Sequence, residues 1–135
     1  MDASVNRIAS SADERALLVA IQLKGADNHR IVYSLEELKL LVKTAGGIVV
    51  ESVVVRRDAI DPAFIIGKGY VEKFKTMIND LSLKLIVFDL NNIRPAQIRN
   101  LEEELKCRVV GRNEIILDIF ARRARSAEAK IQVEL

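Results

Sequence analysis

Cysteine, histidine and aromatic residues are scarce in this sequence, and each scarcity excludes a class of protein. Cys107 is the single cysteine, so the chain has no internal disulfide and no cysteine-rich metal site. His29 is the single histidine and has no cysteine or acidic cluster in ligand spacing, so neither a metal centre nor a catalytic triad is predicted. Aromatic residues make up 4% of the 135 residues, so we expect a core of Ile, Val, Leu and Ala.

Long hydrophobic runs are missing as well. The apolar stretches are short, such as LIVF at 85–88, and fall far below the roughly 18 residues that a membrane span needs. Residues 1–13 contain no apolar core of a secretory signal and are expected to form a flexible lead-in. Half of the residues are apolar, which predicts one soluble folded domain, and the lone cysteine fits a reduced, cytoplasmic location.

Apolar segments alternate with amphipathic segments along the chain. Strands are expected at 15–23, 48–55, 83–88 and 108–110. Helices are expected at 35–45, 70–81, 95–106 and 114–125, where apolar residues recur at spacings of three and four. Ser34 and Glu37 form a capping box that predicts the start of the first helix. The alternation predicts an α/β fold, a three-layer domain at 14–125 with a mostly parallel four-stranded sheet flanked by helices.

The turn Gly67-Lys68-Gly69 precedes the second helix and suggests a phosphate loop, because bare N–H groups and the positive end of a helix attract anions. The nucleotide motif G-x-x-x-x-G-K-[ST] is not met, because Gly69 follows the lysine and Pro62 occupies the position of the first glycine. The dinucleotide fingerprint G-x-G-x-x-G lacks its third glycine. We therefore interpret Gly67 and Gly69 as a structural turn.

Asp89 follows the third expected strand, at the edge of a parallel sheet where ligand sites gather. A phosphoacceptor domain would carry an acidic pair after its first strand, but this chain has QLKG at 22–25. Asp89 is therefore interpreted as a turn or cap residue, and Cys107 as a small core residue rather than a nucleophile. An alternative remains open, in which Gly67–Gly69 and Asp89 bind a phosphate or nucleotide ligand.

Basic residues gather in two places, although the net charge of +2 does not by itself indicate a nucleic-acid binder. The candidate contacts to an RNA phosphate backbone are Arg56, Arg57, Lys68, Arg122, Arg123, Arg125 and Lys130. They form one surface only if the fold brings them together. Otherwise they are solvated charges, with Asp118 and Arg122 as a local ion pair, on a domain that binds other proteins. The scarcity of aromatic residues argues against reading a single strand by base stacking.

Four segments together carry a resemblance to a known family. They are SLEELKLLVKTAGG at 34–47, RRDAIDPAFIIGKGYVE at 56–72, QIRNLEEEL at 97–105 and ILDIFARRARSAEAKIQVEL at 116–135. In this order and spacing they resemble the N-terminal domain of the HflX family of ribosome-associated GTPases, over about Glu14 to Leu135.

The resemblance implies a plan in which this α/β domain precedes a helical linker, starting at 126–135, and then a GTPase domain. GTP and magnesium are expected only in that GTPase domain, because this chain has no guanine-nucleotide motif and none of the family's catalytic residues. The implied partners are the large ribosomal subunit, through its rRNA, and the protein's own GTPase domain. The implied function is a non-catalytic domain that helps bind the ribosome and regulates GTP hydrolysis, without a cofactor, metal or membrane span of its own.

Overall fold

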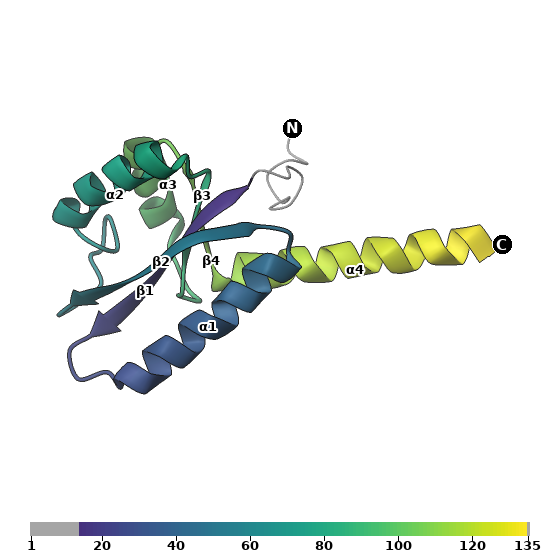
Figure 1. Cartoon of the computed structure of the whole chain (residues 1–135), viewed down its shortest axis with the longest axis horizontal. Coiled ribbons are helices and arrows are strands. Elements are labelled where there is room, and N and C mark those ends of the chain that lie inside the picture. The colour runs from purple at the N-terminus through teal and green to yellow at the C-terminus, as the bar shows by residue number, and fades with distance from the viewer. Residues whose placement is uncertain (1–13, 135) are drawn as a thin grey trace.

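The computed structural model describes the backbone of residues 14–134 and the side chains of that range except 122–123 and 126–134, so the predicted lead-in at 1–13 lies outside it. Strands and helices alternate along the described chain (Figure 1). The strands are β1 (Arg15–Leu23), β2 (Ile48–Arg57), β3 (Leu85–Phe88) and β4 (Arg108–Gly111). The helices are α1 (Asn28–Thr44), α2 (Lys68–Leu81), α3 (Pro95–Leu105) and α4 (Arg112–Glu134).

The four strands form one parallel sheet in the order β2-β1-β3-β4. Helices α1 and α4 cover one face, and α2 and α3 cover the other (Figure 1). The predicted three-layer α/β domain with a four-stranded sheet is therefore confirmed. The strands end at what we call the carboxyl edge of the sheet and begin at its amino edge, and the helices run back from the first edge to the second.

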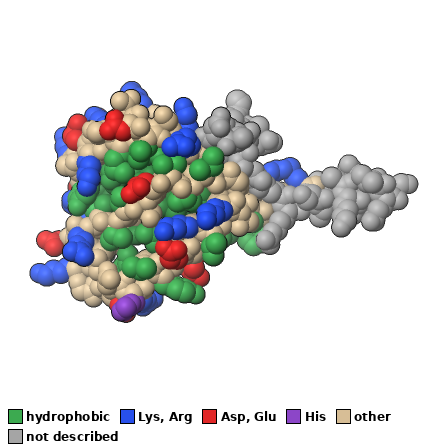
Figure 2. All heavy atoms as spheres, in the orientation of Figure 1, with side chains coloured by type: hydrophobic (Ala, Val, Ile, Leu, Met, Phe, Trp, Pro, Cys, Tyr) green, Lys and Arg blue, Asp and Glu red, His purple; other side chains and the backbone are tan. Residues whose placement is uncertain are grey.

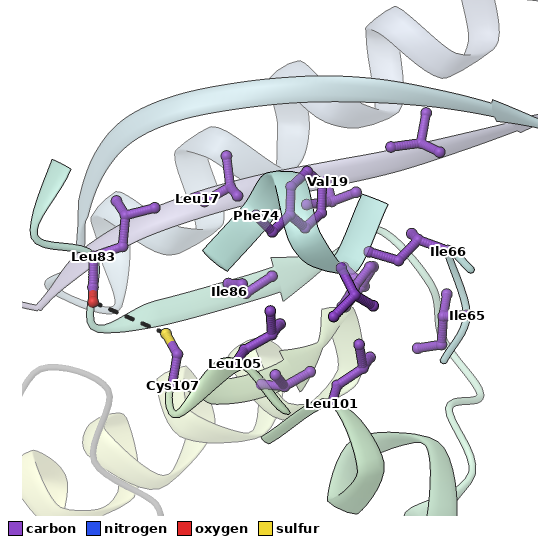
Figure 3. Close-up of a cluster of buried hydrophobic side chains, with 14 of the residues drawn as sticks. Leu17, Val19, Ile65, Ile66, Phe74, Leu83, Ile86, Leu101, Leu105 and Cys107 are labelled. Carbon is purple, nitrogen blue, oxygen red and sulfur yellow. Dashed lines mark hydrogen bonds between the residues drawn. The ribbon is translucent and has the colours of Figure 1, made fainter. Parts of the chain in front are cut away.

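The continuous apolar run of β1 reflects a strand buried on both faces. Leu17, Val19 and Ile21 pack with α2 and α3, in the cluster shown in Figure 3. Ala16 and Leu18 point the other way and pack under α1 and α4. The core under α1 and α4 is aliphatic, as the shortage of aromatic residues predicts. The core under α2 and α3 departs from that prediction, because it also buries Phe74 and Phe88.

The predicted start of the first helix is wrong by seven residues. Helix α1 begins at Asn28, and Asp27 caps it by accepting a 2.9 Å hydrogen bond from the His29 N–H. Ser34 and Glu37 lie inside the helix, where both accept hydrogen bonds from Arg112. The pattern of a capping box is present, but its two side chains serve a contact between α1 and α4.

Helix α4 buries Ile115 and Ile119 against the sheet and then leaves the body of the molecule as a rod (Figure 1). The helical pattern predicted for 114–125 therefore continues through Glu134. None of the helices within residues 14–134 is long and apolar enough to cross a membrane.

Candidate functional site

The loop before α2 is held in one conformation by α3. The Asp61 carboxylate accepts hydrogen bonds from the backbone N–H groups of Ala63 and Phe64, at 3.0 and 2.7 Å. From α3, the Gln97 side chain donates to the Asp61 carbonyl at 3.0 Å and the Asn100 side chain donates to the Ala63 carbonyl at 3.1 Å. These bonds satisfy the polar backbone of a loop that follows directly on the edge strand.

Gly67 closes this loop and is packed against Arg57. The Arg57 guanidinium donates to the Ile66 carbonyl at 3.0 Å and to the Ala59 carbonyl at 3.2 Å. Gly67 has φ +81°, and a Cβ added there would lie 2.5 Å from Arg57 Nη1. Gly69, inside α2, has open space around it. Arg57, a predicted RNA contact, is therefore occupied in shaping the turn.

Arg56 and Lys68 lie on the same corner, at the carboxyl edge, and both are exposed. Arg56 donates to the Gln22 side chain at 3.3 Å. On the face shown in Figure 2, basic side chains are spread among hydrophobic and acidic ones rather than gathered in one patch.

The second predicted cluster lies at the other end of the molecule. Arg122, Arg123, Arg125 and Lys130 all belong to α4, and the exposed Arg125 is the one whose side chain is described. Because α4 starts at the carboxyl edge and runs back past the amino edge, it carries these residues away from Arg56 and Lys68 (Figure 1). The fold does not bring the two clusters into one surface.

Asp89 is held by an ion pair within the fold. Its carboxylate, 7% exposed, accepts a 2.9 Å hydrogen bond from Arg112, the first residue of α4. The same guanidinium donates to Ser34 at 3.2 Å and to Glu37 at 3.1 Å, both on α1. Asp89 is thus joined to the helices on the face opposite α2, and these contacts do not join it to the Gly67 turn.

Cys107 and His29 show no feature of a catalytic or metal site. The Cys107 thiol is buried and contacts the Leu83 carbonyl at 4.0 Å (Figure 3). Burial raises the pKa of the thiol to about 12, which keeps it protonated and unreactive at neutral pH. His29 is exposed on the first turn of α1, and residues 14–134 contain no cluster of three His, Cys, Asp or Glu suited to a metal ion.

A basic hollow that sequence patterns missed lies at the amino edge, between the C-terminal ends of α2 and α3. It has a volume of about 570 Å³, and its polar lining consists of Lys75, Asn79, Ser82, Lys84, Lys106 and Arg108. Lys84 comes directly before β3, and Lys106 shortly before β4. Because the first residues of parallel strands meet at one edge, this convergence could have been found from the strand assignments.

Comparison with known proteins assigns the domain. Residues 32–121 match the family model described as GTP-binding GTPase N-terminal. The chain is 46% identical over 123 residues to GTPase HflX of Lacrimispora saccharolytica, covering 91% of this chain and 28% of that protein. It is 36% identical over 124 residues to GTPase HflX of Escherichia coli, covering 92% of this chain and 28% of that protein.

A solved structure has the same fold. A crystal structure of an SsGBP variant superposes with a TM-score of 0.64 and 26% identity, covering 89% of this chain and 36% of that one. SsGBP in complex with GDP gives the same TM-score at 25% identity, covering 90% and 33%. The chain thus spans less than a third of the length of the two HflX relatives described above. By its matched residues and its α/β architecture, the chain belongs to the HflX family of GTPases, as their GTP-binding GTPase N-terminal domain.

Proposed function

We propose that this chain acts as the non-catalytic N-terminal domain of a longer cytoplasmic GTPase. In this proposal it helps bind the large ribosomal subunit through rRNA phosphates, and it regulates the GTPase domain. The observation that carries the proposal is the form of α4, which begins in the core and leaves the body bearing a cluster of arginines (Figure 1). A projecting basic helix offers charges to an extended polyanion without disturbing the fold that supports it.

The same helix supports the regulatory part of the proposal. Arg112 fixes the start of α4 to β3 and α1, so that the direction of the rod is set by the domain. A GTPase domain attached beyond residues 126–135 would be oriented by this rod. GTP and magnesium belong to that domain in our proposal.

Phosphate or nucleotide binding at Gly67–Gly69 and Asp89 gains no support from the geometry. Arg112 occupies the Asp89 carboxylate, and Arg57 fills the space beside Gly67. Isothermal titration of the chain with GTP, ATP and inorganic phosphate should therefore show no binding. Micromolar affinity that disappears in Lys68→Ala would establish this alternative instead.

Co-sedimentation with purified large ribosomal subunits tests the main proposal. We expect binding at low salt that weakens steeply as the salt concentration rises. Contacts between basic side chains and phosphates release counterions from the RNA, and added salt opposes this release. The double variant Arg122→Glu/Arg123→Glu should bind about tenfold or more weakly, since phosphate contacts are turned into repulsion. Absence of binding by the wild-type chain even at low salt would overturn the proposal.

A matched control reverses two charges elsewhere. Lys24 and Arg30 are exposed at the carboxyl edge, and Lys24→Glu/Arg30→Glu changes the net charge by the same amount. This variant should bind ribosomal subunits nearly as well as the wild-type chain. Equal losses in the two variants would mean that net charge, rather than α4, governs binding. Arg56→Glu/Lys68→Glu then measures separately whether the other predicted cluster contributes.

A further inference from the structure

The basic hollow at the amino edge has a composition suited to phosphate groups. Lys84 and Lys106 are exposed beside it, and Asn79 and Ser82 add neutral donors. Lys75 also lines it, but its ammonium is paired with Glu72 and Glu104, each at 3.1 Å. The charge available to a ligand therefore comes mainly from Lys84 and Lys106.

Two residues around the hollow keep side chains where the backbone favours glycine. Ser82 ends α2 with φ 53°, and Lys106 ends α3 with φ 54°, both in the left-handed region. Helices commonly end with glycine in this conformation, because glycine has no Cβ to strain. Strained residues are concentrated at functional sites. A lysine in place of glycine at 106 thus points to a role for its ammonium group.

Arg108 lies between this hollow and a neighbouring one. It lines the hollow at the amino edge and also a second hollow, beside β4, to which α4 contributes Arg125. Arg108 interacts electrostatically with Glu14, so its charge is partly used within the domain. The second hollow is also lined by the acidic residues Glu102, Glu114 and Asp118, so the basic surface does not continue onto the projecting helix. Lys84, Lys106 and Arg108, at the ends of α2 and α3, form what we call the basic track.

We propose that this track binds the phosphate backbone of double-stranded RNA, with Lys84 and Lys106 as its principal contacts. The inference rests on the proposed function and names the surface and the form of RNA. A duplex is indicated rather than a single strand, because the lining contains no aromatic side chain on which unpaired bases could stack. Lysine contacts to phosphate are independent of sequence, as recognition by shape and backbone requires.

Fluorescence anisotropy with a labelled RNA duplex tests the track. Lys84→Ala/Lys106→Gly should bind the duplex roughly tenfold more weakly, and the slope of log affinity against log salt should fall by about 1 per lysine. The melting temperature of the variant protein should stay the same or rise, because glycine relieves the strain of the left-handed backbone at position 106. Lys24→Ala/Arg30→Ala removes the same charge at the opposite edge and should leave affinity and slope unchanged.

Three results would overturn the inference. The first is a Lys84→Ala/Lys106→Gly variant that binds the duplex with wild-type affinity and salt slope. The second is a fall in melting temperature without a loss of affinity, which would show that the two lysines only stabilise the helix ends they follow. The third is a wild-type chain that prefers a single strand of the same length.

Co-sedimentation with large ribosomal subunits distinguishes this inference from the proposed function. If the wild-type chain and Lys84→Ala/Lys106→Gly co-sediment with large subunits equally well, the inference about the track is wrong and the proposed function stands. If the wild-type chain does not co-sediment but the variant still loses affinity for the duplex, the ribosomal function is wrong and the RNA site stands.

Discussion

Gly67 and Gly69 are two positions apart, yet only Gly67 has a backbone that requires glycine. Gly67 has a positive φ and is packed against the Arg57 guanidinium. We expect Gly67→Ala to lower the free energy of unfolding by about 2–4 kcal/mol, because it adds backbone strain and displaces Arg57 from Ile66. Gly69→Ala should raise it by about 0.5 kcal/mol, since alanine is the better helix former. Urea denaturation of both variants measures the contrast, and equal effects would contradict it.

Glu14 makes stability depend on pH in an unusual direction for a carboxylate. Burial raises its pKa above the ordinary value of 4.5, and the opposing attraction of Arg108 is smaller. The folded state therefore holds this proton more tightly than the unfolded state, and Glu14 lowers stability once pH rises above about 4.5. Glu14→Gln should be more stable than the wild type at pH 7, and the difference should vanish towards pH 4. Denaturation curves across this range test the sign.

One guanidinium joins the start of α4 to α1 and to Asp89 at the end of β3. Arg112 bonds to Asp89, Ser34 and Glu37, and Asp89 is 7% exposed. Arg112→Met should cost about 3 kcal/mol of unfolding free energy, because it leaves a buried carboxylate without its partner. Asp89→Asn in the same chain should recover part of the loss, and a double-mutant cycle measures the coupling. Strictly additive effects would show that Asp89 is stabilised by other groups.

The edge strand β4 is covered by two glutamate side chains. On β4, the outward N–H groups of Val109 and Gly111 donate to the side chains of Glu102 and Glu114, at 2.9 and 3.0 Å. These carboxylates block the pairing positions that an edge strand offers to another chain. The glutamates look like solvated helix residues in the sequence, and only the pairing of α3, β4 and α4 reveals their role.

Spacing and composition were sufficient to predict the order of the elements and the layers. They succeeded because Leu17 to Ile21 are apolar without alternation, whereas the helices repeat at three and four residues. The start of α1 was missed because Ser34 and Glu37 satisfy a local pattern while bonding to Arg112, 78 and 75 residues away. The structural part that Arg57 plays in the turn was not predicted either, because its partner, the Ile66 carbonyl, becomes adjacent only when the loop folds.

At the scale of the whole molecule, the charges are divided between two ends. The predicted cluster at Arg56 and Lys68 lies at the carboxyl edge, and α4 carries the other past the amino edge (Figure 1). Lys84 and Lys106 also lie at the amino edge, although no pattern in the sequence connects them with α4. A parallel sheet sorts residues in this way because everything that precedes a strand collects at one edge and everything that follows it at the other.

We therefore expect the first part of α4 to determine the stability of the domain, and the part beyond the core to contribute to RNA binding alone. Among its described side chains, none beyond Ile119 is buried, so the core is complete before the arginine cluster. A chain ending at Arg125 should unfold with a free energy within about 0.5 kcal/mol of the full chain, as surface changes usually do. Ile115→Ala in the full chain should cost about 3 kcal/mol, because it opens a cavity under α4.

The shortened chain should also show which part of α4 contacts RNA. Lys130 is lost, whereas Lys84, Lys106 and Arg125 remain, so duplex affinity should fall by less than in Lys84→Ala/Lys106→Gly. Chemical denaturation and anisotropy on the same preparations measure both properties. A large loss of stability on shortening would place 126–135 within the folded domain and move its boundary beyond 125. Unchanged stability together with complete loss of duplex binding would transfer the RNA contacts from the amino edge to the end of α4.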